Sequence, residues 1–61
     1  MKTSGFMSYE TFRSYWAELP PNVTVRYHGL QWDEDPVDFE RIKIVEDGRI
    51  AHIYCFDKKE Q

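Results

Sequence analysis

The chain has 61 residues and carries 11 acidic against 8 basic side chains, for a formal charge of −3. A chain of this length forms one domain at most, and its acidic excess argues against binding along duplex DNA, which usually requires a basic patch. Its single cysteine excludes an internal disulfide, so a stable fold depends on a well-packed aromatic core or on association.

Residues 1–7 combine a glycine with small polar side chains and show no hydrophobic period. They are predicted to form a flexible arm of the single domain 1–61. They lack the apolar run of a signal peptide, and no stretch of the sequence approaches the ~20 apolar residues of a membrane span. Together with the lone thiol, these features predict a cytoplasmic protein that does not bind membranes.

Residues 8–19 are predicted to form a helix. Ser8 is suited to the N-cap position, and Glu10 places a negative charge in the first turn. Pro20 and Pro21 end the helix, because the residue before a proline is driven out of the α region. An apolar stripe runs along this helix and is expected to face the core; it consists of Tyr9, Phe12, Trp16 and Leu19.

Three strands are predicted, over residues 22–28, 38–46 and 49–57, because apolar and polar side chains alternate in each. The last two flank Asp47-Gly48, a dipeptide that favours a two-residue hairpin turn. A longer loop precedes this hairpin, and the sequence leaves open whether the first strand lies beside the second or the third. The predicted fold is α+β, with one N-terminal helix packed on a three-stranded, mostly antiparallel sheet.

The turn decides which side chains share a face of the hairpin. A type I′ turn that places Glu46 opposite Arg49 predicts a core face and an outer face. The core face contains Ile42, Ile44, Ala51, Ile53 and Cys55; the outer face contains Phe39, Arg41, Lys43, Val45, Ile50, His52, Tyr54 and Phe56. The alternative is a type I turn with a bulge at Gly48, which slips the pairing by one residue and puts Ile50, His52 and Tyr54 with Ile42 and Ile44.

The outer face of the predicted hairpin brings aromatic rings next to cations. Such a surface on an open sheet stacks unpaired bases and holds phosphates, and it also suits a protein partner. The alternative is cross-strand pairing that only stabilises a solvated sheet, with the loop around Trp32 folded over the rings. The candidate contact residues are Phe39, Arg41, Lys43, His52, Tyr54 and Phe56.

A second candidate surface lies in residues 32–40, where five of nine residues are acidic. An acidic loop with an aromatic anchor is suited to a basic partner, because charge speeds the encounter and the ring supplies affinity. The alternative is a solvated loop with Trp32 in the core. Calcium binding is disfavoured, because the acids lack the spacing and the turn glycine of a calcium loop. The candidate contact residues are Trp32, Asp33, Glu34, Asp35 and Asp38.

The sequence contains no catalytic or metal-binding motif. Cys55 is the candidate nucleophile and His28 and His52 are the candidate bases, but the predicted register points Cys55 into the core and His52 outward. The cysteine and histidines do not have zinc-ligand spacing. The sequence therefore predicts a protein that is not an enzyme and that binds no cofactor or metal.

These features favour a small acidic protein-binding module. By analogy of size and charge, it would be an inhibitor or regulator of a larger phage, mobile-element or host protein. One alternative is single-stranded nucleic-acid binding through the outer face. Another is a structural or assembly subunit, for example a homodimer joined through an exposed strand edge.

Overall fold

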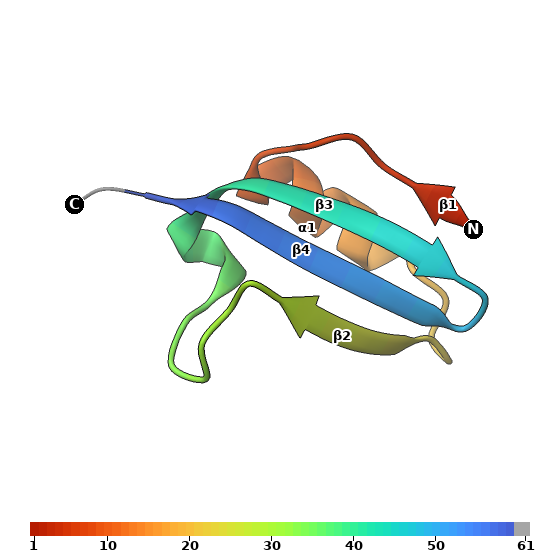
Figure 1. Ribbon diagram of the computed structural model, residues 1–61. Coiled ribbons are helices and arrows are strands. Elements are labelled where there is room, and N and C mark those ends of the chain that lie inside the picture. Colours follow the sequence, from red (N-terminus) through yellow and green to blue (C-terminus); the bar gives the residue numbers. More distant parts are fainter. Residues whose placement is uncertain (60–61) are drawn as a thin grey trace.

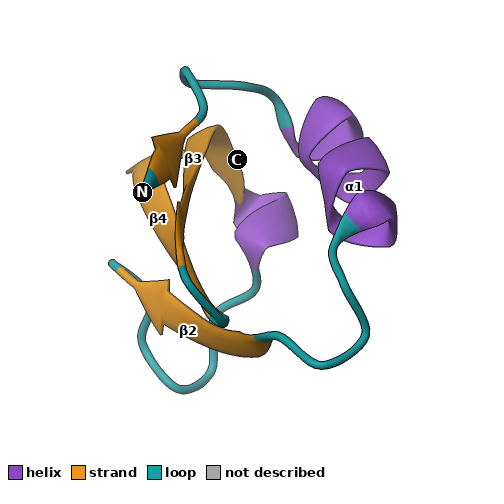
Figure 2. Cartoon of the chain, turned by 90° about the vertical axis from the view of Figure 1, so that its right-hand side faces the viewer, coloured by secondary structure: helices purple, strands orange, loops and turns teal. Residues whose placement is uncertain are grey.

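The computed structural model describes residues 1–59, so residues 60–61 of the predicted domain lie outside it. Helix α1 (Tyr9–Glu18) packs on one face of a four-stranded sheet (Figures 1 and 2). The strands are β1 (Lys2–Thr3), β2 (Thr24–His28), β3 (Phe39–Asp47) and β4 (Ile50–Lys58), in the order β1-β3-β4-β2, and a short 3₁₀ turn, η1 (Pro36–Asp38), precedes β3. The predicted α+β class and N-terminal helix are confirmed, but the sheet is mixed and has an additional strand.

Helix α1 begins and ends where its capping residues predict. Ser8 has extended backbone angles, and its Oγ accepts a hydrogen bond from the backbone N–H of Thr11 at 3.4 Å. At the other end the N–H of Leu19 donates to the carbonyl of Trp16, and Pro20 follows. Among the described residues, no helix has the length and apolar character that crossing a bilayer requires.

The hairpin of β3 and β4 turns one residue later than predicted. Asp47 pairs with Ile50, so Gly48 and Arg49 form the loop, and the pairing of Glu46 with Arg49 is wrong. Gly48 has a φ of 64° at the first loop position, the position where a type II′ turn requires glycine. The pairing therefore moves by two residues, and a shift of two leaves every side chain on its predicted face.

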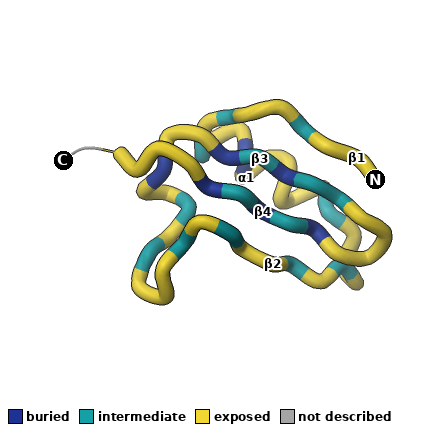
Figure 3. The backbone as a smooth tube through the Cα atoms, in the orientation of Figure 1, coloured by how far each residue is buried: buried dark blue, intermediate teal, exposed yellow. Residues whose placement is uncertain are grey.

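The core lies between α1 and the covered face of the hairpin, and Figure 3 shows its buried positions along β3 and β4. The predicted core face is confirmed, because Ile42, Ile44, Ala51, Ile53 and Cys55 are all buried. Phe12 is the buried residue of α1 and packs in the same cluster. The rings of Tyr9 and Trp16 stand on either side of it, each with its centroid 6.0 Å from that of Phe12.

Phe39 corrects the predicted outer face. It is 5% exposed and belongs to the core cluster, whereas Glu40 and Arg41 after it are both exposed. The alternation of β3 is broken here, opposite Asp57, which has a φ of 57°. Arg41 Nε lies 2.6 Å from Asp57 Oδ2 and spans this irregular end of the hairpin. The kink turns Phe39 to the same face as Ile42.

Strand β2 lies beside β4 and runs parallel to it, with Val25 paired to Ala51 and Tyr27 to Ile53. The sheet is therefore mixed, with two antiparallel pairs and one parallel pair, and the neighbour that the sequence left open is the third predicted strand. Residues 29–38 carry the chain past the C-terminal end of β4 to β3, where Glu34 contacts Lys58 and Asp38 contacts Lys59. Gly29 makes it possible to leave β2 at this point, because its φ is 83° and it lies against the Cys55 carbonyl.

Residues 1–7, predicted as a flexible arm, pair with β3 as the fourth strand. Lys2 pairs with Glu46 and Thr3 with Val45. Ser4 exchanges hydrogen bonds of 2.9 Å with the backbone of Ile44, and Met7 does the same with Ile42. The physical reason is that β3 would otherwise leave a row of N–H and C=O groups without partners.

Candidate functional site

The acidic loop, residues 29–38, projects its tryptophan into solvent. Trp32 is 97% exposed. Both alternatives that the sequence left for it, burial in the core and folding over the rings of the outer face, are therefore wrong. Single exposed apolar residues are common on protein surfaces, but an indole with almost no intramolecular contact is a large apolar area available to a partner. The structure therefore places the indole of Trp32 on the accessible surface of this loop.

Hydrogen bonds hold both sides of the acidic loop. Glu34 Oε2 lies 2.6 Å from Lys58 Nζ, and Glu34 Oε1 accepts from the N–H of Gln31 at 3.0 Å. The hydrogen bonds from Lys58 and Gln31 hold the pKa of the Glu34 carboxyl below its ordinary value. The carbonyl of Asp38 accepts from the N–H of Lys59 at 2.7 Å. The loop is thus tied to the end of β4, while its tip stays accessible.

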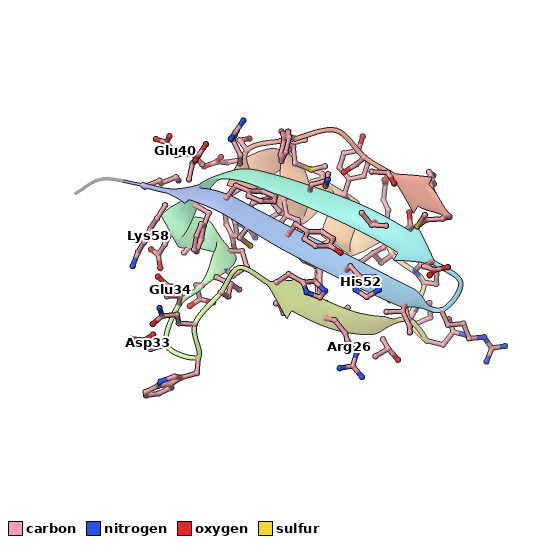
Figure 4. All side chains as sticks on the ribbon, viewed as in Figure 1. Arg26, Asp33, Glu34, Glu40, His52 and Lys58 are labelled. Carbon is pink, nitrogen blue, oxygen red and sulfur yellow. The ribbon has the colours of Figure 1, made fainter. Side chains whose placement is uncertain are left out.

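The remaining acids of the loop are available for an external cation. Asp33, Asp35 and Asp38 are exposed, and no basic side chain of residues 1–59 forms an ion pair with them. Figure 4 shows Asp33 projecting from the outer bend of the loop and Glu34 turned back toward Lys58. Glu34 therefore has a structural role, whereas the three aspartates present negative charge along the segment that carries Trp32.

An aromatic groove of about 430 Å³ lies between α1 and the strand-and-loop segment that carries Asp35. Its lining residues are Tyr9, Phe12, Arg13, Trp16, Ala17, Tyr27, Asp35 and Pro36. The rings of Trp16 and Tyr27 are stacked, with centroids 6.4 Å apart and planes 23° from parallel. Burial raises the pKa of the Tyr27 hydroxyl, with further contributions from the charges of Cys55 and Asp35. Because Asp35 belongs to both, the groove and the acidic loop form one continuous surface.

Trp16 and Tyr27 are the site residues that the sequence analysis missed. Trp16 was expected in the core, yet it is 42% exposed, and Tyr27 is 44% exposed. Helix α1 lies mainly over β3. The side of α1 that carries Trp16, and the face of β2 that points to the same side of the sheet, are therefore left partly exposed. The available signal was the presence of a single helix, because a helix about 10–12 Å in diameter lies over only about two strands spaced about 4.8 Å apart.

The outer face of the sheet, which Figure 1 shows toward the viewer, carries rings and cations from the N-terminal segment and three strands. Its members are Phe6, Arg26, His28, Arg41, Lys43, His52, Tyr54 and Phe56. The predicted residues Arg41, Lys43, His52, Tyr54 and Phe56 do share this face; Phe39 does not, and Phe6, Arg26 and His28 join it.

The rings and cations of the outer face contact one another. The guanidinium of Arg41 lies 4.8 Å from the centroid of the Phe6 ring, and Lys43 Nζ lies 5.5 Å from the rings of both Phe6 and Tyr54. His28 stacks on Tyr54 at 4.6 Å, and its Nε2 lies 2.8 Å from Nδ1 of His52. These contacts order the side chains into a preformed platform.

The two predicted contact sets do not meet in one site. In Figure 4, Asp33 and Glu34 lie beyond the end of β2, whereas Arg26 lies on β2 and His52 on β4. The structure therefore offers two surfaces: the acidic loop with its aromatic groove, and the outer face.

Cys55 and the histidines lie on opposite faces of the sheet. Cys55 is buried under α1, and burial raises the pKa of its thiol, with a further contribution from the charge of Glu34. His28 and His52 lie on the outer face, so this geometry does not form a thiolate–imidazole pair. Within residues 1–59, no group of three or more His, Cys, Asp or Glu side chains is arranged to hold a metal ion.

Comparisons of the chain with protein-family models, with curated proteins and with solved structures found no match.

Proposed function

We propose that this chain is a non-enzymatic protein-binding module whose acidic loop docks Trp32 on a basic surface of a larger protein. The observation that carries this proposal is the 97% exposure of Trp32 on a loop that is tied at its sides and that contains three exposed aspartates. By covering such a surface, the module would act as an inhibitor or regulator of its partner.

The energetics of the loop suit this role. Burying an indole removes roughly 200 Å² from water, which is worth about 5 kcal/mol before the costs of association. Tryptophan is enriched among the few residues that dominate interface affinity. Since the hydrogen bonds of Glu34 and Asp38 already hold the loop, less conformational entropy is lost on binding. The aspartates add electrostatic steering toward a basic partner.

Replacing Trp32 by alanine is expected to weaken binding to the partner by about 30-fold or more, equivalent to the ~2 kcal/mol loss of an interface hot spot. Wild-type and variant proteins are immobilised, exposed to lysate of the source cells, and compared by quantitative mass spectrometry. The affinity of each enriched protein is then measured after purification. The variant is expected to fold like the wild type, because Trp32 makes no core contact. Circular dichroism checks this.

Tyr15→Ala is the matched control, since Tyr15 is another exposed ring, 48% accessible, on α1. It is expected to capture the same proteins as the wild type. Association should also slow with added salt, because the loop aspartates are solvent-exposed charges. Equal capture by the wild type and Trp32→Ala would reject the proposed role of the loop.

A second candidate function is single-stranded nucleic-acid binding by the outer face, and the contacts of Lys43 with Phe6 and Tyr54 favour it. Bases would stack on the rings while the neighbouring cations meet phosphates. A fluorescein-labelled 12-nucleotide oligothymidine probe is titrated at low and high salt. Nucleic-acid binding would be supported by an affinity that falls steeply with added salt. It would also be supported by an affinity about tenfold lower in Tyr54→Ala. No binding at low salt would remove it.

A further inference from the structure

We propose that the aromatic groove beside the acidic loop binds a proline-rich segment of the protein partner, with an arginine or lysine next to the prolines. The inference deepens the proposed function and rests on it, because it names the partner chemistry for the surface that continues from the acidic loop. Four aromatic side chains, the charge of Asp35 and the accessible polar groups of the rings carry the argument.

The groove is lined by an unbroken series of rings. Tyr9, Phe12 and Trp16 follow one another along α1 with centroids 6.0 Å apart, and Trp16 stacks on Tyr27 across the gap to β2. Phe12 is buried at the base, whereas Trp16 and Tyr27 keep about half of their surface accessible. The groove therefore presents aromatic faces on a rigid support formed by a helix and a strand.

Aromatic grooves of this kind suit a polyproline II segment. Such a segment is already extended and stiff, so binding costs little conformational entropy, and its pyrrolidine rings pack on aromatic faces. Proline lacks an N–H, so the segment offers mainly carbonyl acceptors. The side-chain donors of Tyr9, Trp16 and Tyr27 make no hydrogen bond to another residue within the described part of the chain, and they are available to those carbonyls.

The charges around the groove specify the residue that flanks the prolines. Asp35 lines the groove and has no ion-pair partner among residues 1–59. A cation beside the prolines would meet this carboxylate. Arg13 lines the opposite wall, on α1, and disfavours a cation there. The segment is therefore oriented, with its basic end toward the acidic loop.

The test uses Trp16 as its own reporter. The chain has two tryptophans, so Trp32→Phe leaves Trp16 as the single indole and keeps a ring in the loop. Three ten-residue peptides are titrated against it: one with two Pro-x-x-Pro turns followed by arginine, one with alanine at every proline, and one with glutamate in place of the arginine. The first should change Trp16 emission saturably. The alanine peptide should bind at least about tenfold more weakly, and the glutamate peptide several-fold more weakly.

Matched variants locate the binding. Tyr27→Ala removes a half-exposed ring of the groove and should weaken the arginine peptide by about tenfold. Asp35→Asn should weaken the arginine peptide and leave the glutamate peptide unchanged or slightly improved. Tyr15→Ala removes an exposed ring outside the groove and should have no effect.

Several outcomes would overturn the inference: no emission change up to millimolar peptide, equal binding of the alanine peptide, or full binding by Tyr27→Ala. A dimer in sedimentation that shields Trp16 would instead assign the groove to a second copy of the chain. Loss of partner capture in Trp32→Ala without any peptide binding would reject the groove and keep the proposed function. Peptide binding with undiminished capture by Trp32→Ala would reject the role of Trp32 and keep the groove.

Discussion

Replacing Gly29 by alanine is expected to lower the free energy of unfolding by about 2–5 kcal/mol, measured by urea denaturation. Gly29 has a φ of 83°, which costs any residue with a Cβ atom about 1–2 kcal/mol. A Cβ would also lie 2.5 Å from the carbonyl oxygen of Cys55. This neighbour is backbone of β4, so relief requires β2 to move away from the strand it pairs with.

Gly48→Ala is the matched control, because Gly48 also has a positive φ, 64°, but a Cβ there meets nothing within 4 Å. Its free energy of unfolding should fall only by the cost of placing a Cβ atom at a positive φ, about 1–2 kcal/mol. Equal stability of the two variants would contradict the close approach of Gly29 to β4. Since Gly29 joins the strand that carries Tyr27 to the acidic loop, the Gly29 variant should also lose peptide binding and partner capture.

The hairpin faces are the part of the fold that the sequence predicts best. The side-chain period of a strand is two, so an error of two residues in the pairing leaves Ile42 and Ile53 in the core and Tyr54 outside. The alternation from Ile42 to Cys55 therefore carried more information than the turn dipeptide. The prediction from this alternation failed at Phe39, because the backbone is irregular at this end of the hairpin, near Asp57.

The edges of the sheet were harder to predict, because pairing there is mostly a matter of backbone groups. The hydrogen bonds of Ser4 and Met7 to β3 involve main-chain atoms or a small hydroxyl, which leave no hydrophobic pattern. The alternation of Val23, Val25 and Tyr27 predicts a strand but does not identify its neighbour. Only the path of residues 29–38 in three dimensions places β2 next to β4.

The two tryptophans show the limit for the candidate site. Large aromatic residues are usually at least half buried, and periodicity assigned Trp16 to the core, while nothing in the sequence decided the position of Trp32. In the structure Trp32 makes almost no intramolecular contact and Trp16 borders a groove. Exposure of both rings follows from the small size of the chain, because one short helix cannot cover the sheet and the loop as well.

The aromatic groove depends on Phe12. Replacing Phe12 by alanine is expected to lower the free energy of unfolding by about 3–5 kcal/mol. Phe12 is the buried residue of α1 and contacts the rings of Tyr9 and Trp16, so its loss leaves a cavity under the helix. A chain of this size has a total stability of only about 3–9 kcal/mol. The helix should therefore undock or the domain unfold, which is measured by urea denaturation with Trp16 fluorescence.

Phe12→Leu separates the loss of packing from the loss of the ring. Leucine still fills much of the site, so the stability loss should be smaller than that of alanine, whereas peptide binding should fall because the series of rings is broken. Ser14→Ala, at an exposed position of α1, should change stability by no more than about 0.5 kcal/mol. If Phe12→Ala were as stable as Ser14→Ala, α1 would not be held to the sheet by its one buried ring, and the groove would lose its structural basis.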